Sequence, residues 1–200
     1  MDRLRTVVKP GMSTLEIDED VEDFIHRAGR GAAFKGYRGF PATVCISINE
    51  EVVHGIPSAQ RAIHEGDIVG LDLGCIVEGY YADCAFTLAI GEVPPQVQQL
   101  LDVTRESLEL GHPGVPAGPP TLRRLARHPV STSRRTASRS CAPSSGHGIG
   151  RALHEEPQVP NFGDPGRGPQ LRPGMVLALE PMVTMGQLGG RGSWTTAGRP

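Results

Sequence analysis

The apolar residues of the first hundred or so positions follow two spacings, one helical and one strand-like. From position 13 to about 28 they recur every three or four residues, and Ser13-Thr14-Leu15-Glu16 forms a capping box, so we expect a helix that ends near Gly29. Its predicted buried face consists of Ile17, Val21, Phe24, Ile25 and Ala28. The apolar run from Thr43 to Ile48 predicts a strand, and the stretch from Pro95 to Leu110 predicts a second helix.

Residues 67–90 have the pattern of one β-hairpin. Two β-prone runs flank Glu78-Gly79, a turn signal, and the midpoint between Asp72 and Asp83 falls within a residue of this turn. If the two aspartates face each other across the ladder, their Cβ atoms lie roughly 5 Å apart. Carboxylates this close repel unless cations lie between them, and a two-metal centre places its ions about 3.5–4 Å apart. A surface hairpin with two unrelated aspartates is the alternative that this pattern leaves open.

Two later residues also carry the chemistry of metal ligands. Glu180 follows the apolar run Met175–Leu179, and Asp72 lies in a similar run, so we expect both carboxylates to be buried. An unpaired buried charge costs on the order of several kcal/mol. His147 lies in the glycine-flanked sequence Gly146–Gly150. Together these residues indicate bound cations.

Length and composition favour an ordinary globular enzyme. The 200 residues are enough for one domain with a core, and mixed helices and strands with a hairpin predict the α+β class. A net charge of −2 indicates neither nucleic acid nor membrane as a partner. No apolar stretch approaches the roughly 20 residues of a spanning helix, and we find no signal-peptide pattern. The four cysteines show no Cys-x-x-Cys spacing, so we expect reduced thiols and a cytoplasmic location.

Residues 112–145 differ from the rest of the chain. They contain no Asp or Glu but six arginines among many Pro, Ser and Thr, with no apolar periodicity. One interpretation is a disordered basic loop able to contact RNA or anionic surfaces. The interpretation we favour is an aberrant segment translated out of frame, because codons permitted for these residues can encode a helix-and-strand pattern in the other frames.

Five motifs, in this order, closely resemble those of type I methionine aminopeptidases, from about Lys9 to Trp194. The motifs are Tyr37–Pro57, the Asp72/Asp83 hairpin, Gly146–Gly150, Leu153–Val159 and Glu180–Met182. The resemblance implies the pita-bread fold, in which two pseudo-symmetric halves enclose a curved antiparallel sheet with helices outside. We therefore expect residues 1–200 to form a single catalytic domain of this family.

The resemblance also implies the reaction, which is removal of the initiator methionine from nascent chains by a metal-activated water. It implies two divalent metal ions, and their ligands would be Asp72, Asp83, His147 and Glu180, with Asp83 bridging both ions. Oxygen ligands with one imidazole suit Mn, Fe, Co or Zn. Glu180 would also move the proton of the attacking water.

The same resemblance assigns the substrate contacts. His54 and His154 match the two cleft histidines that contact the peptide and act in catalysis. The predicted walls of the methionine pocket are Tyr37, Phe40, Cys45 and Trp194. For Cys45, burial fits a plain core residue equally well. Leu153 stands where an aromatic residue often closes the pocket.

One part of the family pattern is absent from these 200 residues. The family has a last bridging glutamate in a Glu-His-Thr strand beyond the tryptophan, so we expect the chain as given to have weak or no activity. We expect a peptide substrate, transient contact with the ribosome, no nucleic acid, no membrane and a monomer. The alternatives are a relative that cleaves Xaa-Pro peptides and a non-catalytic pita-bread binding protein.

Overall fold

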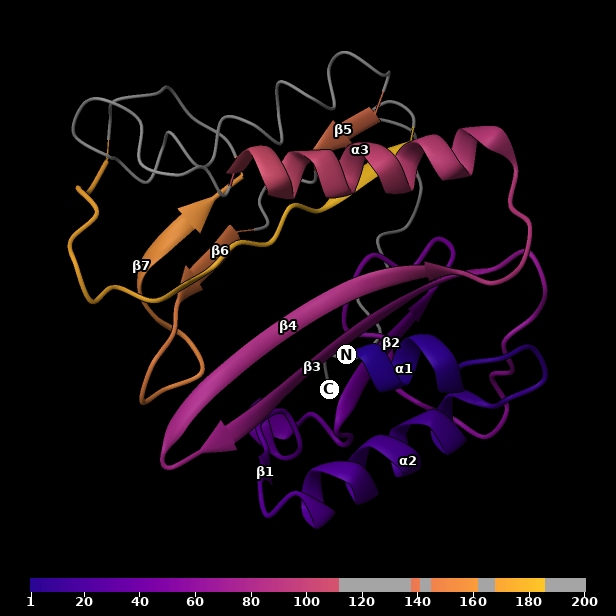
Figure 1. Ribbon diagram of the computed structural model, residues 1–200, viewed down its shortest axis with the longest axis horizontal. Helices are drawn as coiled ribbons and strands as arrows, with labels where there is room; N and C mark the ends of the chain where they lie inside the picture. Colours follow the sequence, from indigo (N-terminus) through magenta and orange to yellow (C-terminus); the bar gives the residue numbers. More distant parts are fainter. Residues whose placement is uncertain (112–137, 141–144, 162–167, 186–200) are drawn as a thin grey trace. The chain divides into compact units, whose positions relative to one another are not determined.

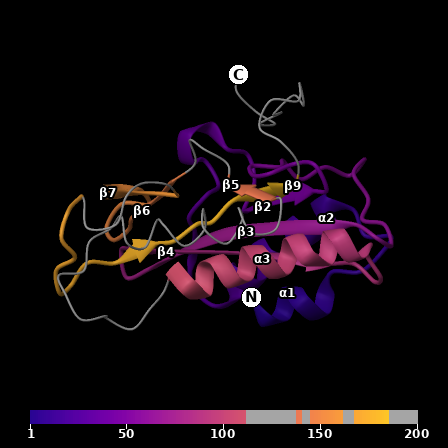
Figure 2. The same ribbon diagram turned by 90° about the horizontal axis from the view of Figure 1, so that it is seen from above.

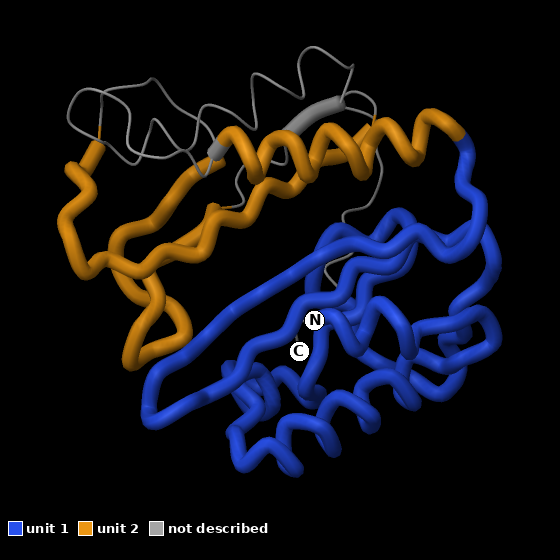
Figure 3. Tube along the Cα trace, in the orientation of Figure 1, with its two compact units in different colours: residues 1–94, 193–200 blue, residues 95–192 orange. Residues whose placement is uncertain are grey.

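The computed structural model describes residues 1–111, 138–140, 145–161 and 168–185. The chain divides into two compact units, residues 1–94 with 193–200 and residues 95–192 (Figure 3). The two units are separately compact, and the expected single catalytic domain stays a prediction. None of the described helices is long and apolar enough to cross a bilayer.

The first unit is a small antiparallel sheet with two helices (Figure 1). Strand β3 pairs on one side with β1 and β2 and on the other with β4. The predicted strand near residues 43–48 and the hairpin are both confirmed. The elements are α1 (Asp2–Val7), α2 (Thr14–Arg27), β1 (Gly31–Ala32), the 3-10 turn η1 (Tyr37–Gly39), β2 (Val44–Ile48), β3 (Ile68–Val77) and β4 (Tyr80–Ala89).

Helix α2 begins at the predicted capping box. The Ser13 hydroxyl accepts a hydrogen bond from the Glu16 N–H at 3.2 Å, and the Glu16 carboxylate accepts one from the Ser13 N–H at 2.7 Å. The predicted buried face is wrong at Ala28, which is exposed past the last turn of the helix, and at Phe24, which is 52% exposed with its ring centroid 5.4 Å from the Arg3 guanidinium carbon. Asp18 is buried instead, because its carboxylate accepts hydrogen bonds from backbone groups.

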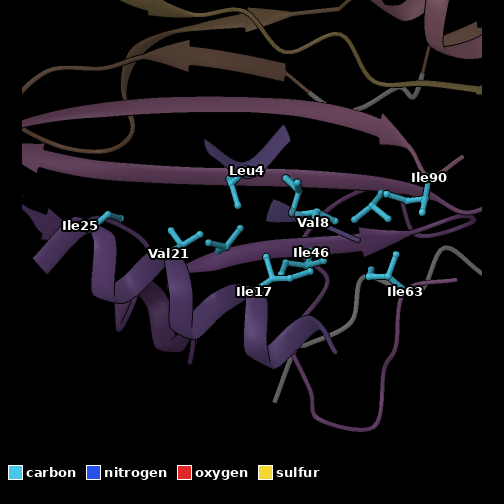
Figure 4. Packing of buried hydrophobic residues seen from close by; sticks show 11 residues of the cluster. Leu4, Val8, Ile17, Val21, Ile25, Ile46, Ile63 and Ile90 are labelled. Carbon is cyan, nitrogen blue, oxygen red and sulfur yellow. The ribbon is translucent and has the colours of Figure 1, made fainter. Parts of the chain in front are cut away.

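The core of the first unit lies between α1, α2 and one face of the sheet (Figure 4). Because side chains alternate along a strand, Val69 and Leu71 of β3 face the helices while Asp72 points to the other face. Both apolar side chains are fully buried. The buried cluster also contains Leu4, Val8, Ile17, Val21, Ile25, Val44, Ile46, Ile63 and Ile90.

Strand β2 donates every second N–H to groups outside the sheet ladder. The N–H of Val44 donates to the Asp18 carboxylate at 2.8 Å, that of Ile46 to the Gly55 carbonyl at 2.8 Å, and that of Ile48 to the Glu51 carboxylate at 2.9 Å. Burial raises the pKa of the Asp18 carboxyl, although its backbone donors act in the opposite direction. Helix α2 and the loop after β2 are thereby bonded to this strand.

The second unit contains helix α3 (Pro95–Gly111), as predicted, and short antiparallel strand pairs. Strand β6 (Ser145–Gly148) pairs with β7 (Glu155–Pro160) and β8 (Leu177–Ala178), and β5 (Ser138–Ser140) pairs with β9 (Val183–Met185) (Figure 2). Most of segment 112–145 lies outside the described residues, so its out-of-frame origin stays a hypothesis.

The packing of α2 on the sheet leads to a stability prediction. Ile17 is fully buried. We expect Ile17→Ala to lower the free energy of unfolding by about 2–4 kcal/mol, because truncation leaves a cavity between helix and sheet. Urea denaturation measures the loss, with Glu19→Ala on the exposed side of the same helix as the control. A loss below about 1 kcal/mol would contradict the packing described here.

Candidate metal centre

The β3–β4 hairpin presents two aspartates on the face that points away from the core. Glu78 and Gly79 form its turn with φ values of 53° and 80°, as expected for a two-residue hairpin turn. Asp72 pairs with Ala85, and Asp83 pairs with Gly74. The aspartates are therefore diagonal neighbours on one face, about 7–8 Å apart for such a pair, and not the directly facing pair that we predicted. The turn sets the register, and its centre between Glu78 and Gly79 lies one position beyond the midpoint between Asp72 and Asp83.

The expected burial of Asp72 and Glu180 is confirmed only in part. Asp72 is half-buried, and the Glu180 side chain is 30% exposed. Glu180 does not lie within a strand either, because β8 ends at Ala178. One carboxylate oxygen of each residue, Asp72 Oδ1 and Glu180 Oε1, is buried.

Cys45 lies directly opposite Asp72 on this face of the sheet. Burial, followed by the negative charges of Asp72 and Asp83, raises the pKa of its thiol. The face therefore concentrates negative charge next to a neutral thiol.

Phe34 belongs to the same face, and the sequence analysis did not identify it. A Cβ at Gly74 would lie 2.8 Å from Phe34 Cε1 and 2.9 Å from Ala33 Cβ. Gly74 is the residue opposite Asp83 and lies two positions from Asp72 on the same face, so the ring packs against the backbone beside both aspartates. No periodic pattern in the sequence connects residue 34 with residue 74, because the contact depends on the pairing of β1 with β3.

Glycines on both sides of His147 allow other backbone segments to approach it closely. A Cβ at Gly146 would lie 2.1 Å from the Ala178 carbonyl oxygen, and one at Gly148 would lie 2.4 Å from that of Glu156. Any side chain at these positions would push the strands apart. The Gly-His-Gly motif therefore has a packing reason, since it lets β6 lie between β7 and β8 with His147 opposite Ala178.

His147 is oriented by its neighbours in the second unit. Its Nδ1 lies 2.8 Å from the Gly148 carbonyl oxygen, which can only accept, so the ring hydrogen belongs on Nδ1. Its Nε2 lies 3.1 Å from Glu180 Oε1. The His154 ring centroid lies 4.2 Å from that of His147, and Asn161 Nδ2 donates to the Glu180 carbonyl at 2.7 Å.

The chemistry of these groups fits a divalent cation. With its hydrogen on Nδ1, the His147 ring directs a lone pair from Nε2 toward a carboxylate oxygen, an arrangement that positive charge stabilises. The first unit supplies the two carboxylates of Asp72 and Asp83. The four predicted ligands therefore form two pairs, one in each unit. No set of three or more His, Cys, Asp or Glu side chains with metal-binding geometry occurs among the residues that the structure describes.

The residues predicted to contact substrate differ in how far they are buried. Tyr37 in η1 and Phe40 after it are half-buried, and Cys45 is buried. His54 and His154 are exposed. Trp194 lies outside the described residues, so its predicted role is not tested.

Comparison with known proteins gives a consistent family. The model described as metallopeptidase family M24 matches residues 1–195. The chain is 46% identical over 189 residues to a methionine aminopeptidase of Clostridium acetobutylicum, covering 93% of this chain and 74% of that protein. It is 43% identical over 188 residues to methionine aminopeptidase 1 of Bacillus subtilis, covering 92% and 74% of the two chains.

Solved structures extend the similarity to the fold. The crystal structure of methionine aminopeptidase from Thermotoga maritima matches with a TM-score of 0.88 at 39% identity, covering 92% of this chain and 74% of that one. An Xaa-Pro dipeptidase from Bacillus anthracis matches with a TM-score of 0.73 at 25% identity, covering 90% and 48%. These matches confirm the predicted pita-bread fold of the α+β class.

The environment of Cys45 leads to a prediction about its reactivity. Because a raised pKa leaves less thiolate at a given pH, we expect chelator-treated protein to alkylate slowly at Cys45 at pH 8, and faster only as the pH rises further. Iodoacetamide labelling followed by peptide mass spectrometry measures the rate, with the more exposed Cys84 as the internal comparison. Equal labelling rates at the two cysteines would contradict this environment.

Proposed function

This chain belongs to the metallopeptidase family M24, and from that premise we propose that it removes the N-terminal methionine from peptides and nascent proteins. The observation that carries the proposal is the similarity to methionine aminopeptidases over 92–93% of the chain, with the predicted metal ligands on the hairpin and next to the Gly-His-Gly strand. The substrate class is a peptide with a free N-terminal methionine.

Two divalent ions, Mn, Fe, Co or Zn, are the proposed cofactors. Asp72, Asp83, His147 and Glu180 would hold them, with Asp83 contacting both. When bound, the ions supply positive charge that polarises a peptide carbonyl and makes water acidic enough to act as a nucleophile near neutral pH. The His147 ring is supported for this role because the Gly148 carbonyl fixes the hydrogen on Nδ1.

The protein's own residues then move protons and orient the peptide. Glu180 accepts the proton of the attacking water and returns it to the leaving amine. His154 stabilises the charge that develops on the carbonyl oxygen, and His54 orients the peptide N–H. The methionine side chain lies against walls formed by Tyr37, Phe40, Cys45 and Trp194.

Two other functions remain as alternatives for experiment. An Xaa-Pro peptidase would share the fold, but the identity is 25% to the Xaa-Pro dipeptidase and 46% to a methionine aminopeptidase. The presence of all four predicted metal ligands, Asp72, Asp83, His147 and Glu180, argues against a protein that has lost its metal site and only binds partners. We further propose a monomer in the cytoplasm that contacts the ribosome transiently.

The bridging role of Asp83 gives a direct test. We expect Asp83→Asn to weaken Mn²⁺ binding by more than about 100-fold, because the loss of a group that only orients a metal ligand already costs about 10- to 100-fold. Isothermal titration measures affinity and stoichiometry. Asp102→Asn, which removes the same charge from the partly exposed side of α3, is the matched control. A stoichiometry of two metals that survives Asp83→Asn would overturn the bridging assignment.

Peptide cleavage tests the reaction itself. We expect metal-loaded protein to release methionine from Met-Ala-Ser slowly, but faster than it releases the first residue of an Xaa-Pro peptide. A chelator and Asp83→Asn should each abolish the release. Quantification of the free amino acid by mass spectrometry gives the rates. Release from Xaa-Pro alone would favour the first alternative, and metal binding with no cleavage of either peptide would favour the second.

A further inference from the structure

The loop that carries His54 has a backbone conformation that its own residues do not favour. His54 has a φ of 62°, in the left-handed region that a residue with a Cβ adopts at a cost. The next residue, Gly55, is confined as well, because a Cβ there would lie 2.1 Å from the Ile46 carbonyl oxygen. Such a conformation persists only where surrounding contacts determine it.

One ion pair spans this loop on both sides of His54. The Arg61 guanidinium contacts the Glu51 carboxylate, which precedes His54, and its Nη1 donates to the Ile56 carbonyl at 2.6 Å, which follows it. The Glu51 carboxylate also accepts the Ile48 N–H at 2.9 Å. A single guanidinium therefore fixes the distance between the two ends of the segment 51–56.

The Glu51–Arg61 pair can constrain the loop because both side chains are mostly buried and the Arg61 backbone is itself hydrogen-bonded. The side chains of Arg61 and Glu51 are only 26% and 20% exposed. The Arg61 carbonyl accepts the Thr14 N–H at 2.8 Å, so its backbone is bonded to the first turn of α2. By contrast, the side chains of the Arg27–Asp23 pair on α2 are 79% and 68% exposed. Exposed pairs of that kind contribute little to structure.

We infer that Glu51 and Arg61 are positioning residues, which hold the His54 backbone in its left-handed conformation and so orient the imidazole for the peptide. The planar fork of arginine suits this function, since it reaches two acceptors at once, and lysine would reach only one securely. The inference rests on the proposed function for the role of His54. Whether the ion pair holds the loop can be measured independently of the proposed function.

Hydrogen exchange on the full chain tests whether the ion pair holds the loop that carries His54. We expect Arg61→Gln to speed amide exchange in the peptide covering residues 46–57 by roughly tenfold, while peptides from α2 change by less than about twofold. Arg61→Lys should give an intermediate increase, and the control Arg27→Gln should give none. Unchanged exchange at residues 46–57 in Arg61→Gln overturns the inference.

The milder variant, Arg61→Lys, distinguishes a general loss of stability from a local release of the loop. If Arg61→Gln speeds amide exchange throughout the first unit, the exchange pattern of Arg61→Lys decides between the two explanations. An increase confined to residues 46–57 in that variant supports the inference, whereas a uniform increase, or none, shows a plain stabilising role and overturns it.

A double-mutant cycle tests whether the pair acts through His54. In metal-loaded protein we expect Arg61→Gln to lower kcat/KM for Met-Ala-Ser by roughly three- to tenfold, and to have no further effect in a His54→Ala background. Additive losses, or no loss with Arg61→Gln alone, overturn the positioning of His54. If His54→Ala itself leaves kcat/KM unchanged, the proposed role of His54 fails, and the exchange experiment still decides whether the pair holds the loop.

Discussion

The alternation of side chains along β3 is the constraint on which the first unit depends. Val69 and Leu71 face the helices, and Asp72 faces the other way. A shift of one residue in the pairing would place Asp72 beneath α2 and move Leu71 out of the core. Because such a shift exchanges a fully buried leucine for a carboxylate, the free energy of the core also fixes the position of the predicted metal ligands.

The second unit fixes its candidate ligands by a different physical means. The strands described in this unit are short, and its described residues form no apolar sheet face comparable to that of the first unit. Instead, the missing side chains of Gly146 and Gly148 let neighbouring carbonyl groups come within distances that a Cβ would forbid. His147 is thereby held against the strand that leads to Glu180. Hydrophobic packing therefore positions one pair of residues, and close backbone contact positions the other.

Local patterns predicted the elements of this fold better than their contacts. The capping box of α2 and the Glu78-Gly79 turn are determined by a few neighbouring residues, so the sequence identifies both. The exposure of Phe24 and the burial of Asp18 depend on how α2 lies on the sheet. Apolar periodicity alone predicts the opposite, with Phe24 buried and Asp18 exposed. The candidate metal ligands can be picked out by residue type and by their motifs, and their role stays a prediction.

The finer geometry of the candidate site required the structure. A turn signal locates a hairpin to within a residue, but one position decides whether Asp72 and Asp83 face each other or lie diagonally. The ring of Phe34 reaches this face through a pairing of distant strands, and the left-handed φ of His54 occurs in a loop that the Glu51–Arg61 ion pair spans. The spacing of residues along the chain predicts none of these contacts.

The hydrogen bonds on the outer side of β2 have a consequence for behaviour at high concentration. A strand at the edge of a sheet offers a row of free N–H groups to which a strand from another molecule can pair, which is a common route to aggregation. Along β2 those donors at Val44, Ile46 and Ile48 are occupied by Asp18, Gly55 and Glu51. An incoming strand would have to displace two carboxylates and a loop, so this side of the sheet resists intermolecular pairing.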